Sequence, residues 1–306
     1  MILKNMLRNL VLLGAVSFTL ILAAEGKEEE PSSLRELGQQ ANRERKFKEA
    51  ISCADRLLAR PDLDEYNRIE AHLIRGIALK NLNRKKEAVE EMNRILDRTY
   101  PKLPSSHQMA PVGNFIAGLE EISLQEKFLL FFERCPEKAD YQKPLQRNWK
   151  NALNVQYLRK GTAALDAKRT SEAIETLQKA LKLSATGNNY FYYGLACLQG
   201  KKYQEADRCA ENLSALKKKR SSVILKSQAL FGLGRKEEGR KLLRDYLESD
   251  EEEYIPPYQC GLMGNAAFFM KDPKSLELVI RRLRENPSIP AYLEQKIALW
   301  QKWMKP

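Results

Sequence analysis

Small and apolar residues recur at fixed offsets along most of the chain. In five stretches, a small anchor residue is followed by further small or apolar residues 3, 12, 16 and 19 places later. The anchors are Gly38, Gly76, Gly161, Gly194 and Ser227, and Ser227 is the only polar residue in the pattern. Steps of three and four residues keep side chains on one face of a helix, whereas the longer step between offsets 3 and 12 crosses a polar turn. The pattern therefore predicts five pairs of antiparallel helices, called repeats 1 to 5 below.

The positions at the anchor and 12 places later hold the smallest side chains. The later positions are Ala50, Ala88, Ala173, Ala206 and Gly239. Small side chains let two helix backbones approach each other closely, as crossings near the lower end of the usual range of about 8–10 Å require. The last three anchors are 33 residues apart, so we expect successive repeats to stack on their neighbours.

This pattern resembles the tetratricopeptide repeat (TPR) family over about residues 33–100 and 150–250. Ser227 and Gly239 in repeat 5 depart from the Gly and Ala that the family prefers. The resemblance implies an all-α fold, a right-handed α-solenoid of antiparallel helix pairs in a TPR-like superhelix. It is carried by Leu37 and Gly38 with Phe47 and Ala50, by Gly76 with Ala88, by Gly161 with Ala173, and by Gly194 with Tyr203 and Ala206.

Segments outside the repeats also carry helical patterns. Residues 107–134 predict two helices, the second opened by a capping box of Ser123 and Glu126. Residues 258–270 and 273–284 predict a sixth, degenerate pair, with Asp272 as the N-cap of its second helix. Residues 291–304 predict a terminal helix that covers the last open face of the array, as such arrays need. The alternative for Trp300 and Trp303 in that helix is a role as anchors for a partner.

The first 24 residues are typical of a secretory signal peptide. Lys4 and Arg8 precede fifteen residues without a charge, which end in small side chains. As a helix this apolar run is about 22 Å long, shorter than the roughly 30 Å hydrocarbon core of a bilayer. We therefore expect an exported protein, periplasmic or secreted, and a membrane anchor formed by residues 9–24 is the alternative. Whether the signal is cleaved stays open.

These features predict an order of segments along the chain. The order is a signal peptide (1–24), an acidic spacer (25–33), repeats 1 and 2 (34–100), a degenerate helical pair (101–150), repeats 3 to 5 (151–250), an acidic loop with the sixth pair (251–287) and a C-terminal capping helix (288–306).

Composition and charge narrow the classes of protein. With 43% hydrophobic and 30% charged residues among 306, the chain is neither a polytopic membrane protein nor a disordered one. The formal net charge is +12, and thirteen basic but only five acidic residues lie between Lys201 and Arg244. This stretch is either a solvated face or a surface that docks to an anionic envelope surface or an acidic protein. Its predicted basic surface comprises Lys217, Lys218, Lys219, Arg220, Arg235, Lys236 and Arg240.

No pattern of catalytic or metal-binding residues is present in the sequence. The chain has two histidines, His72 and His107, and it lacks a Gly-rich phosphate loop, a Gly-x-Ser-x-Gly elbow and a Cys-x-x-Cys pair. We therefore expect no enzymatic activity, no catalytic residues, no metal and no cofactor. Cys197 and Cys209 fall on the two helices of repeat 4, either as buried small side chains or as a disulfide in an oxidising compartment.

The resemblance to TPR proteins also implies a binding groove. In that family the first helices of successive repeats line a concave groove, at positions six and three before the anchor and one and four after it. The Lys/Asn/Arg clamp with which co-chaperones of the family hold a C-terminal carboxylate is not matched at Leu73 and Ile77 or at Leu158 and Thr162. The apolar candidates for the groove are Leu73, Ile77, Val155, Leu158, Leu165, Phe191, Leu195, Leu198, Ile224 and Phe231.

The function expected from these features is a non-enzymatic scaffold for protein–protein interaction in the cell envelope. Its partner would be a peptide or an apolar or amphipathic helical segment of another protein, bound in the groove. The alternatives are an accessory subunit of an envelope or secreted enzyme complex, and docking of the basic surface to an anionic envelope surface. An exported protein would not meet nucleic acid, and the oligomeric state stays open.

Overall fold

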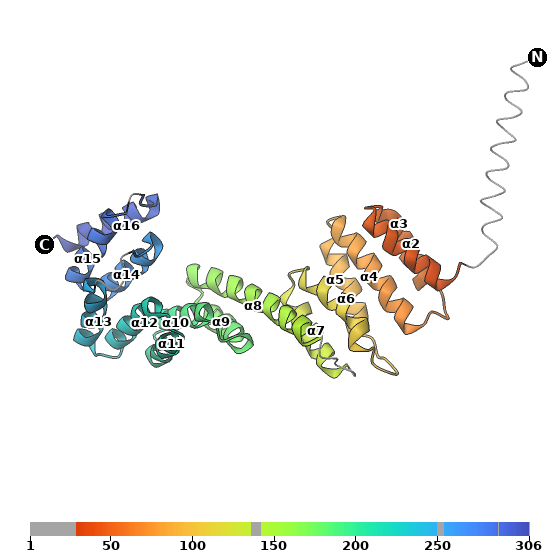
Figure 1. Ribbon diagram of the computed structural model, residues 1–306, viewed down its shortest axis with the longest axis horizontal. Helices are drawn as coiled ribbons and strands as arrows, with labels where there is room; N and C mark the ends of the chain where they lie inside the picture. Colours follow the sequence, from red (N-terminus) through yellow and green to blue (C-terminus); the bar gives the residue numbers. More distant parts are fainter. Residues whose placement is uncertain (1–28, 136–141, 250–253, 287, 306) are drawn as a thin grey trace, which may run out of the picture. The chain divides into compact units, whose positions relative to one another are not determined.

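The computed structural model describes residues 29–135, 142–249, 254–286 and 288–305. Every regular element in these ranges is an α-helix, from α2 to α16 (Figure 1). The predicted all-α fold of antiparallel helix pairs is confirmed. The predicted signal peptide lies outside the described residues. No helix in the described ranges is long and apolar enough to cross a bilayer.

The chain divides into two compact parts, an N-terminal unit of residues 1–149 and a C-terminal unit of residues 150–306. In the N-terminal unit, α4 packs against α2, α3, α5 and α6, so that each helix pair stacks on the next. Its helices are α2 (Pro31–Arg43), α3 (Phe47–Leu58), α4 (Glu65–Asn81), α5 (Lys85–Leu96), α6 (Ser106–Ala117), α7 (Ile122–Arg134) and the start of α8 (Gln142–Asp166).

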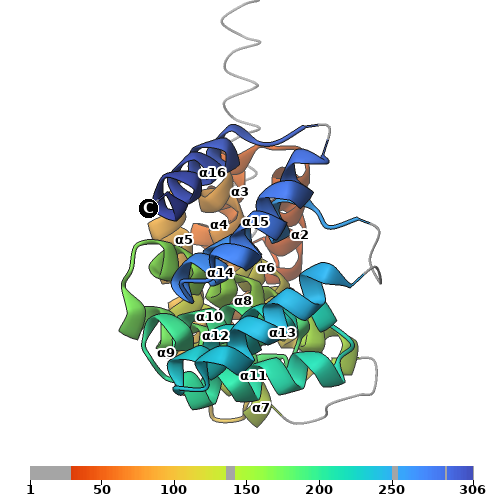
Figure 2. The ribbon, with the colours of Figure 1, turned by 90° about the vertical axis from the view of Figure 1, so that its left-hand side faces the viewer.

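The C-terminal unit contains the rest of α8 and eight further helices. The first helices of successive pairs are neighbours, because α12 packs against both α10 and α14 (Figure 2). The last helix, α16, packs on α14 and α15. The further helices are α9 (Thr170–Leu183), α10 (Gly187–Gln199), α11 (Tyr203–Ala215), α12 (Lys219–Gly232), α13 (Lys236–Glu248), α14 (Pro257–Phe269), α15 (Pro273–Arg284) and α16 (Ala291–Met304).

One kind of turn joins the two helices in each of repeats 1 to 5. A single residue takes the left-handed conformation, such as Asn83 with a φ of 60° and Lys201 with a φ of 58°. The N–H of the next residue bonds to the carbonyl five residues earlier, as from Lys202 to Cys197 over 2.8 Å. This is the Schellman ending of a helix. The accepting carbonyls belong to Ala41, Leu79, Ala164, Cys197 and Leu230, which are the positions three after the anchor.

The glycine anchors lie where a neighbouring helix packs closely against them. A Cβ atom on Gly161 would lie 2.5 Å from Leu177 Cγ in the second helix of repeat 3, and one on Gly194 would overlap Leu225 Cδ1 in the first helix of repeat 5. A leucine thus covers each of these anchors where a side chain would otherwise lie. The anchors are small because a neighbouring helix fills the space above them.

Repeat 5 also brings its helices close together, but its glycine lies in the second helix and not at the anchor. Its anchor Ser227 keeps a side chain, and the Ser227 hydroxyl donates to the Ile224 carbonyl over 3.3 Å. The glycine lies in the second helix instead, at Gly239. A Cβ atom on Gly239 would overlap the Ser227 carbonyl oxygen and lie 3.1 Å from the Phe231 nitrogen. The departures of Ser227 and Gly239 from the family pattern therefore compensate each other.

The helix starts confirm one sequence signal and correct another. The Asp272 side chain accepts from the Ser275 N–H, as predicted for the N-cap of α15. The capping box predicted at Ser123 is wrong, because α7 begins at Ile122, where the carbonyl of Glu121 accepts from the Gln125 N–H over 3.0 Å. A capping box instead opens the preceding helix, α6, and it consists of Ser105 and Gln108.

Terminal helix α16 covers the end of the array through Trp300. This side chain is 1% exposed, and a Cβ atom on Gly264 of α14 would overlap its ring. Trp303 is partly exposed and meets Phe268 edge-on, with the ring centroids 5.4 Å apart. Trp300 therefore belongs to the core and Trp303 to its edge.

We expect the Gly239→Ala substitution to lower the free energy of unfolding by about 2 kcal/mol, because the backbone atoms of Ser227 and Phe231 cannot rotate away from a methyl group. Urea denaturation followed by circular dichroism measures the change. Gly187→Ala is the matched control, since the atom nearest to its Cβ is Cγ of the exposed Lys218, at 3.3 Å. Equal losses in the two variants would contradict the backbone contact.

Candidate functional site

The ionisable side chains of the described residues form structural contacts rather than a metal-binding cluster. No group of three or more His, Cys, Asp and Glu in these ranges could hold a metal ion. His72 Nδ1 lies 2.8 Å from Glu91 Oε2, and Arg94 donates to the other oxygen of Glu91 over 2.8 Å. Glu91 is buried, and these partners compensate its carboxylate within the structure.

The five cysteines are free thiols, so the disulfide considered for Cys197 and Cys209 is not formed in this structure. Four of them are buried, and Cys53 is partly exposed. Burial raises the pKa of Cys197 to about 11 and the pKa of Cys209 to about 12. Burial also raises the pKa of Cys260 to about 11. Because the thiolate is the reactive form, these side chains act as small hydrophobic groups.

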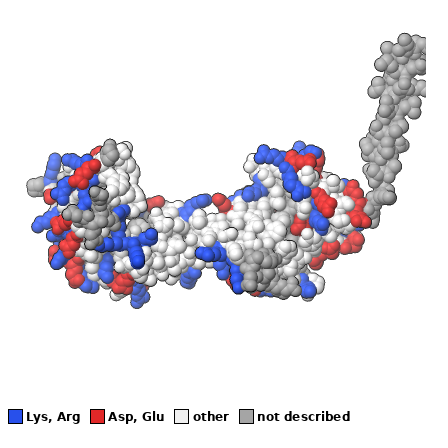
Figure 3. Space-filling model, in the orientation of Figure 1, with Lys and Arg blue, Asp and Glu red and all other residues white. Residues whose placement is uncertain are grey.

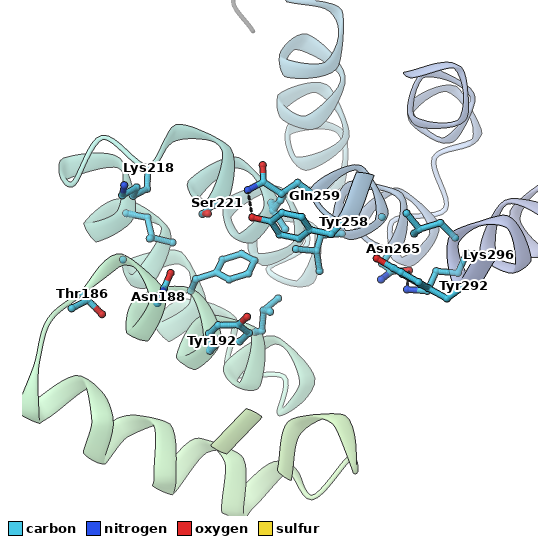
Figure 4. Close-up of a pocket in the computed structure, with 18 residues that line it drawn as sticks. Thr186, Asn188, Tyr192, Lys218, Ser221, Tyr258, Gln259, Asn265, Tyr292 and Lys296 are labelled. Atoms are coloured by element: carbon cyan, nitrogen blue, oxygen red, sulfur yellow. Dashed lines mark hydrogen bonds between the residues drawn. The ribbon is translucent and has the colours of Figure 1, made fainter. Parts of the chain in front are cut away.

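The C-terminal unit contains a cavity of about 680 Å³ between α10, α12, α14 and α16 (Figure 4). Its volume lies within the range of roughly 300–1,000 Å³ typical of binding pockets. The walls combine aromatic and aliphatic side chains with amide, hydroxyl and ammonium groups. The apolar and aromatic ones include Phe191, Tyr192, Leu195, Ile224, Leu262 and Tyr292.

Much of the lining comes from the first turns of the four helices. Thr186 caps α10 by accepting from the Asn189 N–H, and Lys218 stands at the N-cap of α12. Pro257 and Pro290 flank the starts of α14 and α16, where the fixed φ of proline suits a helix start. The four starts thus meet around one space.

Two glycines of α14 allow α16 to pack closely enough to form one side of the cavity. A Cβ atom on Gly261 would lie 2.6 Å from Leu293 Cδ2, and one on Gly264 would overlap the Trp300 ring. Helix α16 therefore packs close to α14, and it contributes Tyr292, Leu293 and Lys296 to the lining. The capping helix both closes the array and completes the cavity.

Hydrogen bonds fix part of the polar rim. The Gln259 side chain donates to the Tyr258 hydroxyl over 2.6 Å (Figure 4). The Gln259 oxygen accepts from Arg220. Arg220 also donates to the Tyr246 hydroxyl over 3.2 Å. On the opposite side, Lys296 Nζ donates to Asn265 Oδ1 over 3.3 Å. These contacts hold Tyr258 and Asn265 in place at the rim.

The structure brings three of the predicted groove residues to this cavity, namely Phe191, Leu195 and Ile224. Phe191 and Leu195 are partly exposed, whereas Ile224 is only 2% exposed. Phe231 lies outside the lining, because its ring packs edge-on against Phe269 and the Arg240 guanidinium lies 5.4 Å from its centroid. Leu198 is also outside the lining and packs in the core of repeat 4.

The other predicted groove residues lie on α4 and α8. Val155 of α8 is half-exposed, and Leu158 and Leu165 pack against the core of repeat 3. Leu73 of α4 is 5% exposed, so it offers little surface to a partner, and Ile77 is partly buried. None of these five lines the cavity.

Polar residues on the first helices of repeats 1 and 2 bond to each other. Gln39 donates to Glu70 over 2.8 Å, and Arg35 donates to Asn67 over 3.0 Å. Asn42 donates to the Ile74 carbonyl over 2.9 Å. The polar groups of this face therefore stabilise the stacking of α2 on α4.

Several residues of the predicted basic surface form ion pairs or hydrogen bonds within the protein, so they do not form one continuous positive surface. Arg235 pairs with Glu238 and Arg240 with Glu237, at 2.5 and 2.6 Å. Lys236 Nζ lies 5.8 Å from the Phe231 ring, and Arg220, described above, points to the cavity rim. Lys217 and Lys219 are exposed beside Lys218. Figure 3 shows positive and negative side chains interspersed on the visible face of the C-terminal unit.

The sequence analysis did not predict the side of the cavity that α14 and α16 form. Tyr258, Leu262 and Asn265 stand three before, one after and four after Gly261, so the groove positions of the family, applied to Gly261, would have found them. No periodic signal marks Tyr292 and Lys296, because the docking of α16 depends on Gly261 and Gly264.

The comparisons with known proteins agree with the repeat pattern in part of the chain. Residues 158–207 match the family model described as tetratricopeptide repeat. A search of curated proteins gave no match. The solved structures similar to the chain include two TPR proteins. A tetratricopeptide repeat protein from Parabacteroides merdae is 11% identical, with a TM-score of 0.36, over 89% of this chain and 98% of that one.

The second is the TPR2AB domain of yeast Sti1 in complex with pHSP90. It is 14% identical, with a TM-score of 0.29, over 82% of this chain and 98% of that one. Both TM-scores are below 0.5, so the fold rests on the helices of this chain. The match to the tetratricopeptide repeat model is limited to residues 158–207.

We expect at most one thiol, Cys53, to react within minutes with a disulfide reagent at about pH 8 in the native protein. A pKa of about 11 leaves roughly one in a thousand Cys197 or Cys260 side chains as thiolate at that pH, and burial blocks access. All five should react in guanidinium chloride. Fast reaction of several native thiols would contradict the packing of Cys197, Cys209 and Cys260.

Proposed function

We propose that this chain is a non-enzymatic scaffold of the cell envelope, which binds a segment of a partner protein in the cavity between α10, α12, α14 and α16. The cavity carries the proposal, since it is a preformed space of about 680 Å³ with aromatic walls and a polar rim. The family match over residues 158–207 supports it, because proteins built from TPR repeats generally mediate protein–protein interactions.

The chemistry of the lining favours binding over catalysis. Its ionisable groups are lysines and tyrosines, without a histidine or carboxylate that could exchange protons with them. General acid–base catalysis needs a group whose pKa lies near the working pH, held within hydrogen-bond distance of the reacting atom. The aromatic and amide groups are instead suited to anchoring a side chain and a peptide backbone.

The contrast between the two units favours the C-terminal unit as the binding site. Gln39, Arg35 and Asn42 already donate to neighbours within the N-terminal unit. A ligand there would have to replace hydrogen bonds that the protein already makes, with little net gain. Asn188 and Ser221 line the cavity and have more freedom to bond to a partner.

Two alternatives remain as separate hypotheses. An accessory subunit of an envelope or secreted enzyme complex would co-purify with that enzyme at fixed stoichiometry. Docking of the basic surface to an anionic envelope surface has less support, because Arg235 and Arg240 pair with glutamates of their own helix. Such exposed pairs weaken the attraction to an anionic surface.

We expect the Phe191→Ala substitution to weaken capture of the partner about tenfold, as loss of a buried aromatic anchor does at interfaces. The assay is a pull-down from envelope extract with residues 27–306, in low and high salt, with unchanged circular dichroism as the check of folding. Leu130→Ala is the control, because Leu130 is 66% exposed on α7 in the N-terminal unit. Equal capture by the wild type and the Phe191 variant would refute the cavity as the site.

Export is tested by the mass of the protein recovered from the envelope of an expressing bacterium. We expect a chain that begins at Glu25 or Lys27, after the small residues Ala24 or Gly26. A chain that stays in the cytosol with its first residues intact would refute export. A chain with intact residues 1–24 in the membrane fraction would favour the anchor.

A further inference from the structure

The charged side chains that line the cavity all have one sign. Lys218 and Lys296 are part of the lining, and no Asp or Glu is. Among the described residues, no carboxylate forms an ion pair with either lysine, and the hydrogen bond that Lys296 donates goes to the neutral Asn265. The cavity therefore has positive charges that the described part of the chain does not neutralise.

Three arginines in or next to α13 differ from the cavity lysines, because each has an acidic partner. Arg235 pairs with Glu238, Arg240 with Glu237, and Arg244 lies 3.3 Å from Asp272. Among the described residues, these three arginines thus have acidic partners and the two cavity lysines have none. An anionic partner would supply the missing charge.

The helix starts add to this potential. Thr186, Ser221, Gln259 and Leu293 lie in or next to the first turns of α10, α12, α14 and α16, and all four line the cavity. The N-terminal end of a helix carries a partial positive charge, which acts over about its first turn. This contribution has the same sign as the lysines, so the two effects reinforce each other.

The apolar part of the lining defines the other half of the occupant. Phe191, Tyr192 and Leu195 of α10 line the cavity together with Leu262 of α14, and these side chains suit one aromatic or aliphatic side chain of a partner. Lys218 and Lys296 lie on opposite sides of the space (Figure 4). A side chain bound between them would have its flanking residues near one lysine or the other.

We propose that the occupant is a short acidic segment of a partner protein, in which Asp or Glu residues flank one aromatic or aliphatic side chain. This inference rests on the proposed function and adds the chemistry of the partner. The apolar side chain provides affinity through burial, whereas the lysines select acidic flanks and speed association. The carboxylates concerned are side chains within the segment, so a free C-terminus is not required.

The test begins with a phage-displayed library of random peptides, selected on residues 27–306 and without a free C-terminus. We expect enriched peptides to carry net negative charge and an aromatic or aliphatic residue. A synthetic fluorescein-labelled copy of the most enriched peptide is then measured by fluorescence anisotropy. The double variant Lys218→Gln/Lys296→Gln should bind it about tenfold more weakly, and Lys218→Arg/Lys296→Arg should bind nearly as well as the wild type.

A matched control separates local charge from overall charge. The double variant Lys241→Gln/Lys274→Gln also removes two positive charges, but from exposed positions on α13 and α15. It should change the affinity less than twofold at physiological salt. An equal effect of both double variants would overturn the proposal, because the lysines of the cavity would then have no special role.

The outcomes distinguish this inference from the proposed function. If the enriched peptides show no acidic bias but lose binding in the Phe191→Ala variant, the proposal of an acidic partner is overturned. The proposed function of the cavity then still stands. No enriched peptide, or binding unaffected by Phe191→Ala, would overturn both. Binding to phosphatidylglycerol vesicles that the Lys218→Gln/Lys296→Gln variant alone loses would assign the lysines to a lipid surface and overturn the proposal.

Discussion

The structure depends on helices that approach each other over side chains too small to hold them apart. Leucines occupy the space above Gly161 and Gly194, and in repeat 5 the glycine moves to position 239 so that the backbone of α13 can approach that of α12. The same constraint builds the candidate site. Gly261 and Gly264 admit Leu293 and Trp300 of α16, so the close packing that ends the array also places Lys296 at the cavity.

Local rules made most of the fold predictable from sequence. The offsets of the pattern follow from one helix face, one Schellman turn and a second helix face, all within a few residues of each other. The capping box shows where such rules are ambiguous. Ser105 with Gln108 and Ser123 with Glu126 both fit the signature, and only the first begins a helix, because α7 already starts at Ile122. The turn before α7 determines where that helix starts, and this turn lies outside the four-residue signature.

The candidate site was predictable only where it follows the repeat. A rule counted from the anchors placed Phe191, Leu195 and Ile224 on one surface, and all three line the cavity from consecutive first helices. It failed for Phe231, whose position depends on Phe269 in the next pair and on Arg240 in the second helix of its own repeat. Contacts between residues far apart in sequence override a local periodicity, and the α16 residues of the cavity are of that kind.

In the proposed function, hydrogen-bond saturation is the reason why the C-terminal unit, and not the first helices of the N-terminal unit, would bind a partner. A polar group that already has a partner gains little from a ligand, because one hydrogen bond replaces another. Gln39 and Glu70 satisfy each other across α2 and α4, so that face stabilises the array. At the cavity, Lys218 has no carboxylate beside it among the lining residues, and a carboxylate brought by a partner would form a pair that the described residues do not make. The sign of the missing charge, more than the apolar area, therefore sets which partners the cavity can distinguish.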